Sequence, residues 1–144
     1  MSVVAAIDVG GMSIKRGVVT IAPPDGGVDL LAPVPIDATA DVDDLLGQFR
    51  DALDPVLRRV ASASARDGVV APVGVGVAFP GPMDYGRGVP FLRGQRKFEA
   101  LHGVDLRSWM ATTWAGMPLD ARFVNDAEAA ALGECLAGAG RGTG

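Results

Sequence analysis

Three polar stretches hold the residue types that could handle a phosphate group and a hydroxyl group. In the first, Asp8 is followed by Gly10, Gly11, Ser13 and Lys15. Adjacent glycines let backbone N–H groups approach an anion closely, because no Cβ atom stands in the way. Ser13 and Lys15 could add donors to the phosphate oxygens, and Asp8 could hold a hydrated divalent cation. A tight β-hairpin turn would explain the same two glycines equally well.

The second stretch is Asn125-Asp126, where a predicted strand ends and a predicted helix begins. Ligands of open α/β sheets bind at the carboxyl ends of the strands. The Asp126 carboxylate could accept the proton of a substrate hydroxyl, and the Asn125 amide could hold the substrate's other hydroxyls. Helix capping is the competing interpretation, with Asn125 and Glu128 as a capping box or Asp126 as the cap.

The third stretch is Pro80-Gly81-Pro82, which follows another predicted strand. The segment 83–103 after it has no clear periodicity, and long irregular segments in compact domains are usually functional. The competing interpretation is a plain proline-rich corner. Since each polar cluster falls at a strand end, the three together indicate phosphoryl transfer to a hydroxyl, with Asp8 at the metal, the glycine stretch at the phosphates and Asp126 at the proton.

Composition bounds the class of protein. The chain has 144 residues, which favours one domain, and its 49% hydrophobic content suffices for a packed core. No apolar run approaches the roughly 18 residues of a membrane helix, and no signal peptide is recognisable at the N-terminus. A single cysteine excludes an internal disulfide and favours the cytoplasm. The net charge of −4 gives no support for a nucleic-acid surface.

Hydrophobic periodicity predicts eight main elements. Strands are expected at 3–7, 14–22, 28–36, 73–79 and 119–124, and helices at 41–60, 105–115 and 126–137. Pro55 should kink or split the first helix near Asp54. The resulting order, β-β-β-α-β-α-β-α, predicts an α/β fold with a mixed sheet and helices packed on it.

Four segments, 8–15, 79–84, 97–107 and 125–134, resemble in order and spacing the motifs of the ROK family (repressor, open reading frame, kinase). These are sugar kinases and sugar-responsive repressors with the actin-like, ribonuclease-H-like ATPase fold. The resemblance covers essentially the whole chain. It implies the N-terminal lobe of an ATP-dependent, glucokinase-like hexose kinase of carbohydrate metabolism, which uses Mg²⁺.

The resemblance also implies roles for individual residues. Asp126 matches the family's catalytic base, and Asn125 matches its sugar-binding neighbour. We expect Glu128 and Pro82 to contribute to the sugar site as well. The phosphate or nucleotide side is expected to use Asp8, Gly10, Gly11, Ser13 and Lys15, with Asp8 holding Mg²⁺ through water.

Three departures from the family's pattern bear on these roles. The family usually has Gly-Gly-Thr, whereas in this chain Met12 follows the two glycines and the hydroxyl comes one position later, at Ser13; the Met12 side chain cannot donate to phosphate. Glu128 stands where the family often has Asn. The family's zinc motif, its second phosphate motif and its adenosine site lie beyond residue 144, and His102 and Cys135 lack ligand neighbours at usable spacing.

The chain is therefore expected to comprise an N-terminal lobe, 1–138, and a glycine-rich tail, 139–144, where the second lobe would begin. Alone, it is expected to be inactive as a kinase and to self-associate through apolar surface meant for that lobe. The expected partners are a small sugar and a nucleotide. The sequence leaves open which sugar is bound and whether ATP or polyphosphate is the phosphoryl donor. The alternatives are a non-catalytic sugar-binding module and a fragment of a sugar-responsive transcriptional regulator. The second is disfavoured because Asp8 leaves no room for a preceding helix-turn-helix.

Overall fold

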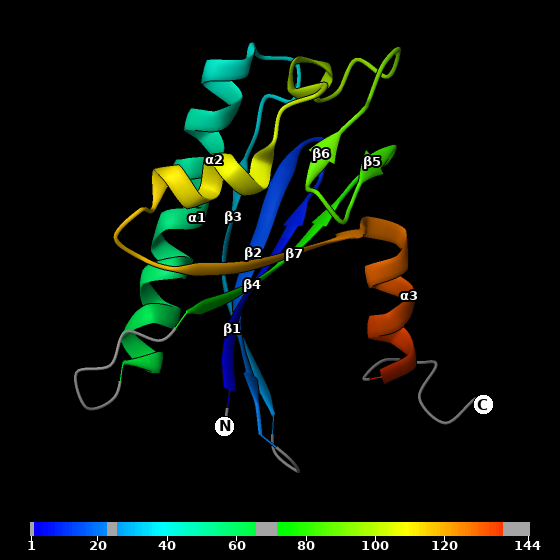
Figure 1. Cartoon of the computed structure of the whole chain (residues 1–144). Helices are drawn as coiled ribbons and strands as arrows, with labels where there is room; N and C mark the ends of the chain where they lie inside the picture. The colour runs from blue at the N-terminus through cyan, green and yellow to red at the C-terminus, as the bar shows by residue number, and fades with distance from the viewer. Residues whose placement is uncertain (1, 23–25, 66–71, 137–144) are drawn as a thin grey trace.

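A five-stranded mixed sheet forms the centre of the computed structural model, which describes residues 2–22, 26–65 and 72–136 (Figure 1). Its strands are β1 (Ser2–Val9), β2 (Ser13–Ile21), β3 (Gly27–Pro35), β4 (Val73–Phe79) and β7 (Leu119–Asn125), in the order β3-β2-β1-β4-β7. The first three strands pair antiparallel, whereas β4 runs parallel to both β1 and β7. The predicted mixed sheet is thus confirmed.

The helices are α1 (Val42–Ser64), α2 (Leu106–Thr113) and α3 (Asp126–Leu136). The order of the large elements is the predicted one. Three short elements were not predicted, namely β5 (Met83–Asp84), β6 (Val89–Pro90) and the 3₁₀ helix η1 (Glu99–Leu101), because two or three residues are too few to show a periodicity. No helix within the described ranges is both long and apolar enough to cross a membrane. Residue 137 and the predicted tail lie outside the described residues.

Helix α1 begins at Asp41, whose carboxylate accepts a hydrogen bond from the Asp44 N–H at 2.9 Å. Of the kink or split predicted near Asp54, the split is wrong, since α1 is one continuous helix through Pro55. Buried side chains on both sides of the proline hold it against the sheet, and the Arg16 guanidinium of β2 donates to the Ala52 carbonyl one turn before it. The packing of α1 against the sheet has outweighed the local tendency of proline to interrupt a helix.

The two faces of the sheet are covered by different helices and to different extents. Alternate strand residues, such as Ile7, Val77 and Phe123, are buried under α1 and α2. The other face carries small residues, among them Ala6 and Gly76, and of the described helices only α3 lies over it, near β4 and β7 (Figure 1). An open, largely apolar hollow of about 370 Å³ lies on this face. Helix α3 buries none of its residues.

Candidate functional site

The carboxyl ends of β1, β4 and β7 lie side by side at one edge of the sheet (Figure 1). In the strand register, Asp8 pairs with Ala78, and Ala78 pairs with Val124. Neighbouring strands are about 4.8 Å apart, so the axes of β1 and β7 are about 10 Å apart at this edge. The structure therefore brings the first stretch and the Asn125-Asp126 stretch within the reach of one small ligand.

The glycine stretch forms the turn between β1 and β2. The Gly10 N–H donates to the Ser13 carbonyl at 3.0 Å, and the Met12 carbonyl accepts from the Ile36 N–H at 3.1 Å. The hairpin interpretation is therefore correct for the backbone, and the N–H of Gly10 is already used. The N–H groups of Gly11 and Met12, in contrast, have no acceptor among the described residues, so two donors remain for an anion.

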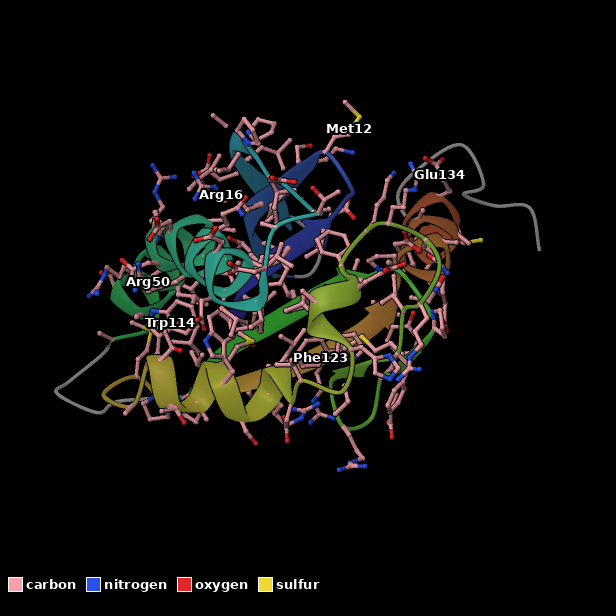
Figure 2. The ribbon with its side chains drawn as sticks, turned by 90° about the horizontal axis from the view of Figure 1, so that it is seen from above. Met12, Arg16, Arg50, Trp114, Phe123 and Glu134 are labelled. Atoms are coloured by element: carbon pink, nitrogen blue, oxygen red, sulfur yellow. The ribbon has the colours of Figure 1, made fainter. Side chains whose placement is uncertain are left out.

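The Met12 side chain points away from the sheet and is 82% exposed (Figure 2). It contributes no contact at the turn that would exclude a ligand. Ser13 begins β2 and is half-buried.

Asp8 and Lys15 are cross-strand partners on the open face of the sheet. The Lys15 Nζ lies 3.7 Å from an Asp8 carboxylate oxygen, and the two side chains are 69% and 48% exposed, respectively. Lys15 is thus beside Asp8 rather than over the glycine turn. Because exposed ion pairs are weak, a ligand can recruit either partner at little cost.

Asp8 is the carboxylate that the sequence assigns to Mg²⁺. No group of three or more metal-binding side chains occurs in the described part of the chain. Magnesium is usually bound by one or two carboxylates, with waters and substrate phosphates completing the shell. A single half-exposed aspartate fits an ion that is shared with a phosphate. It does not fit a closed metal cage.

Asn125 caps helix α3. Its Oδ1 accepts from the N–H groups of Ala127 and Glu128 at 3.0 and 3.3 Å. Its Nδ2 donates to the Tyr85 hydroxyl at 2.9 Å, and that hydroxyl donates to the Phe79 carbonyl at 3.1 Å. The capping interpretation is therefore realised, and one amide hydrogen of Asn125 remains for a substrate.

Tyr85 was not identified from the sequence. Its hydroxyl joins the ends of β4 and β7, because it bonds both Phe79 and Asn125. Two features of the sequence could have pointed to it: Tyr85 is the chain's single tyrosine, and it follows closely on the Pro80–Pro82 corner. An amphipathic side chain in that place suits a partly buried strand end.

Asp126 is the first residue of α3 and is partly buried. One carboxylate oxygen accepts from the Ala127 N–H at 2.8 Å. The other oxygen has no donor among the described residues, so it is available to a hydroxyl. Glu128, one turn into the same helix, is exposed.

The proline corner lies against this strand end. A Cβ atom on Gly81 would stand 3.0 Å from the Tyr85 hydroxyl and 3.4 Å from the Asn125 Nδ2, so the glycine backbone closes over that hydrogen bond. The Gly81–Pro82 peptide bond is cis, and the Pro82 carbonyl accepts from the Phe91 N–H at 2.9 Å. Pro82 itself is exposed beside the site.

Comparison with known proteins yields solved structures alone, since no family model and no curated sequence matches the chain. A glucokinase from Parabacteroides distasonis matches at 25% identity and a TM-score of 0.61, over 94% of this chain and 34% of that one. An inorganic polyphosphate/ATP-glucomannokinase from Arthrobacter sp. strain KM matches at 26% identity and a TM-score of 0.62, over 99% and 51%. A ROK hexokinase from Thermus thermophilus matches at 27% identity and a TM-score of 0.55, over 97% and 39%.

The chain therefore spans between about a third and a half of the length of these sugar kinases. The resemblance to a ROK-family lobe, predicted from four short motifs, is confirmed by the fold over nearly the whole chain.

Proposed function

Starting from the fold of a ROK-type sugar-kinase lobe, we propose that this chain is the N-terminal lobe of an ATP-dependent, glucokinase-like hexose kinase. The observation that carries the proposal is the placement of two groups at one sheet edge. The turn with free N–H donors follows β1, the carboxylate of Asp126 follows β7, and only β4 separates the two strands. A phosphoryl donor and a hydroxyl acceptor can then be held next to each other.

Asp126 is the proposed general base. As the hydroxyl oxygen of the sugar bonds to the terminal phosphorus, the bond from that phosphorus to the bridging oxygen breaks, and the bridging oxygen leaves with the donor. The hydroxyl proton passes to the free carboxylate oxygen of Asp126. The sugar's other hydroxyls are assigned to the spare amide hydrogen of Asn125 and to the exposed Glu128 and Pro82.

The donor phosphates are assigned to the β1–β2 turn. The N–H groups of Gly11 and Met12 donate to phosphate oxygens, and Lys15 supplies positive charge from the neighbouring strand. Asp8 would hold Mg²⁺ through water, and the ion, when bound, neutralises charge on the phosphates. The fold leaves the donor open, because one of the similar enzymes carries both polyphosphate and ATP in its name.

A polypeptide of these 144 residues alone is expected to have negligible kinase activity. One lobe cannot close over the substrates, exclude water or clamp a nucleotide from both sides. Catalysis is therefore best tested in a chimera in which this chain replaces the matching half of the Arthrobacter glucomannokinase.

In that chimera, the substitution Asp126→Asn should lower kcat for glucose about 10²–10⁴-fold, because an amide cannot accept the proton. Asp120→Asn is the matched control, since Asp120 lies in β7, the strand that precedes Asp126, and is exposed in an ion pair with Arg122. It should leave kcat within about twofold of the parent chimera. An Asp126→Asn chimera that transfers phosphate as well as the parent contradicts the assignment. A folded parent that binds glucose and ATP without transfer supports the non-catalytic module instead.

A further inference from the structure

The end of the Lys97 side chain lies against Gly11. A Cβ atom on Gly11 would stand 2.6 Å from Cδ, 2.7 Å from Nζ and 2.9 Å from Cε of Lys97. The ammonium group therefore occupies the space that any side chain at position 11 would fill. Lys97 belongs to the segment 91–103, which is far from Gly11 in the sequence. This cation therefore reaches the glycine turn from outside the stretch 8–15 that contains the turn.

The backbone around Lys97 is held in an unusual conformation. Arg96 and Phe98, on either side of it, have φ angles of 59° and 57°, in the left-handed region that residues other than glycine rarely adopt. Such conformations persist only where the surrounding structure fixes them, and they are concentrated at functional sites. Left-handed residues on both sides of one lysine are therefore a reason to ask what the lysine does.

The contacts that fix this conformation are specific. The Phe98 ring is fully buried, and the Phe98 N–H donates to the Ala38 carbonyl at 2.7 Å. The Arg96 N–H donates to a carboxylate oxygen of Glu99 at 3.0 Å. The backbone on both sides of Lys97 is thereby anchored, and the side chain between the anchors extends toward the β1–β2 turn.

Within residues 2–22, 26–65 and 72–136, Lys97 is a cation without a counter-charge. No carboxylate of the described residues lies within ion-pair distance of it, whereas Lys15 pairs with Asp8. At the turn, the ammonium group joins the free N–H groups of Gly11 and Met12. An unpaired ammonium beside two free amides complements a phosphate group.

We propose that Lys97 binds the terminal phosphoryl group of the donor at the Gly11–Met12 turn and neutralises its charge during transfer. This inference deepens the proposed function and rests on it. The lysine donates up to three hydrogen bonds to non-bridging phosphate oxygens, and it takes no part in the proton transfer, which goes to Asp126. It supplies from a distant loop the favourable interaction that the Met12 side chain cannot make.

Binding of inorganic tripolyphosphate to the 144-residue chain, followed by isothermal titration calorimetry and by the amide NMR signals of Gly11 and Met12, tests the inference. Lys97→Met should weaken binding about tenfold or more and remove the shifts of the Gly11 and Met12 signals. Lys97→Arg should restore part of the affinity. Arg93→Met is the matched control, since Arg93 is an exposed cation of the same loop that hydrogen bonds His102 instead of the turn.

Gly11→Ala supplies a second, independent variant, because its methyl group must push the lysine terminus aside. It should weaken tripolyphosphate binding in the wild-type background and have little further effect in the Lys97→Met background. Since Lys97 is exposed, its substitution should leave the unfolding midpoint unchanged, so a loss of binding is not a loss of fold.

Equal affinity of Lys97→Met and wild type overturns the inference while leaving the kinase proposal standing. Equal weakening by Arg93→Met also overturns it, because the effect is then diffuse charge. A wild-type chain that binds tripolyphosphate through Lys97 but does not bind glucose supports the inference and refutes the sugar-kinase proposal. A wild-type chain that does not bind tripolyphosphate overturns the inference, whereas the kinase proposal is then decided by the Asp126→Asn test in the chimera.

Discussion

Replacing Phe98 by alanine should severely destabilise the protein, although the residue lies in a loop. The Phe98 ring is fully buried, with its centroid 5.3 Å from that of Phe79 and 6.1 Å from that of Phe49. Its left-handed backbone costs about 1–2 kcal/mol. Burial of a phenylalanine ring contributes about 1.5–3 kcal/mol, and aromatic pairs add about 0.5–1.5 kcal/mol each, so burial outweighs the strain.

The expected loss for Phe98→Ala is about 3–5 kcal/mol, the range for removing a buried aromatic ring and leaving a cavity. Since domains are stable by only about 5–15 kcal/mol, the variant should unfold at a much lower urea concentration than wild type. Urea denaturation followed by tryptophan fluorescence measures this loss directly, because Trp109 packs against the same cluster at 6.5 Å from Phe49.

Phe91→Ala is the matched control. Phe91 belongs to the same loop but is 42% exposed and contacts His102 edge-on at 5.6 Å. Its replacement should cost about 1 kcal/mol or less. A loss below about 1 kcal/mol for Phe98→Ala, or equal losses for both variants, would show that Phe98 does not anchor the loop and would remove the physical reason for the position of Lys97.

Two further predictions concern acid stability and self-association. Hydrogen bonds from Arg58 and then from Trp114 hold the pKa of Asp54 below its ordinary value of 3.8, so the folded state takes up a proton less readily than the unfolded chain. The stability from these bonds is complete above the ordinary aspartate pKa and is lost as pH falls through the folded pKa. Asp54→Asn should therefore lose less stability between pH 6 and pH 3 than wild type. Urea denaturation at both pH values measures this difference. Leu30 and Leu132 are 75% and 52% exposed on the side of the sheet that carries α3, so the wild-type chain should self-associate in sedimentation experiments, and Leu30→Lys should shift it toward the monomer. A monomeric wild-type chain at every concentration would contradict the latter.

Much of the architecture could be predicted because the large elements follow simple periodicities. Alternating burial along β1 and β4, with Ala5, Ile7, Val75 and Val77 toward the helices, reproduces the pattern expected of strands covered on one side. The predicted helix start at residue 41 coincides with the observed cap, Asp41, which precedes an apolar repeat. Local chemistry and tertiary packing agree in these places.

Predictions from the local sequence failed where contacts between distant segments determine the backbone conformation. Pro55 predicts a break, but buried side chains on both sides of it keep α1 continuous. Phe98 and Arg96 give no sign in the sequence that they adopt left-handed conformations, because burial and the bond to Ala38 fix Phe98, and a side-chain contact with Glu99 holds Arg96. The approach of Lys97 to Gly11 follows from these contacts and was therefore not predicted.

The position of Asn125 and Asp126 at the sheet edge was predictable, but their hydrogen bonding was not. Asn125 and Asp126 follow a strand in the sequence, and the sheet order brings them to the same edge as Asp8. The engagement of Asn125 with Tyr85 depends on a corner that one-dimensional patterns do not describe. The structure thus leaves Asn125 one free amide hydrogen, which is less than the sequence suggested.

The central claim is that one sheet edge holds the sugar at Asn125-Asp126 and the phosphate at Gly11-Met12. Amide NMR titration of the 144-residue chain tests it most directly, first with glucose and then with ATP and Mg²⁺. We predict that glucose shifts the signals of Asn125, Asp126 and Ala127, and that ATP shifts those of Gly11 and Met12. Shifts confined to the apolar hollow around Ala6 and Gly76, or no shifts with either ligand, would contradict the account.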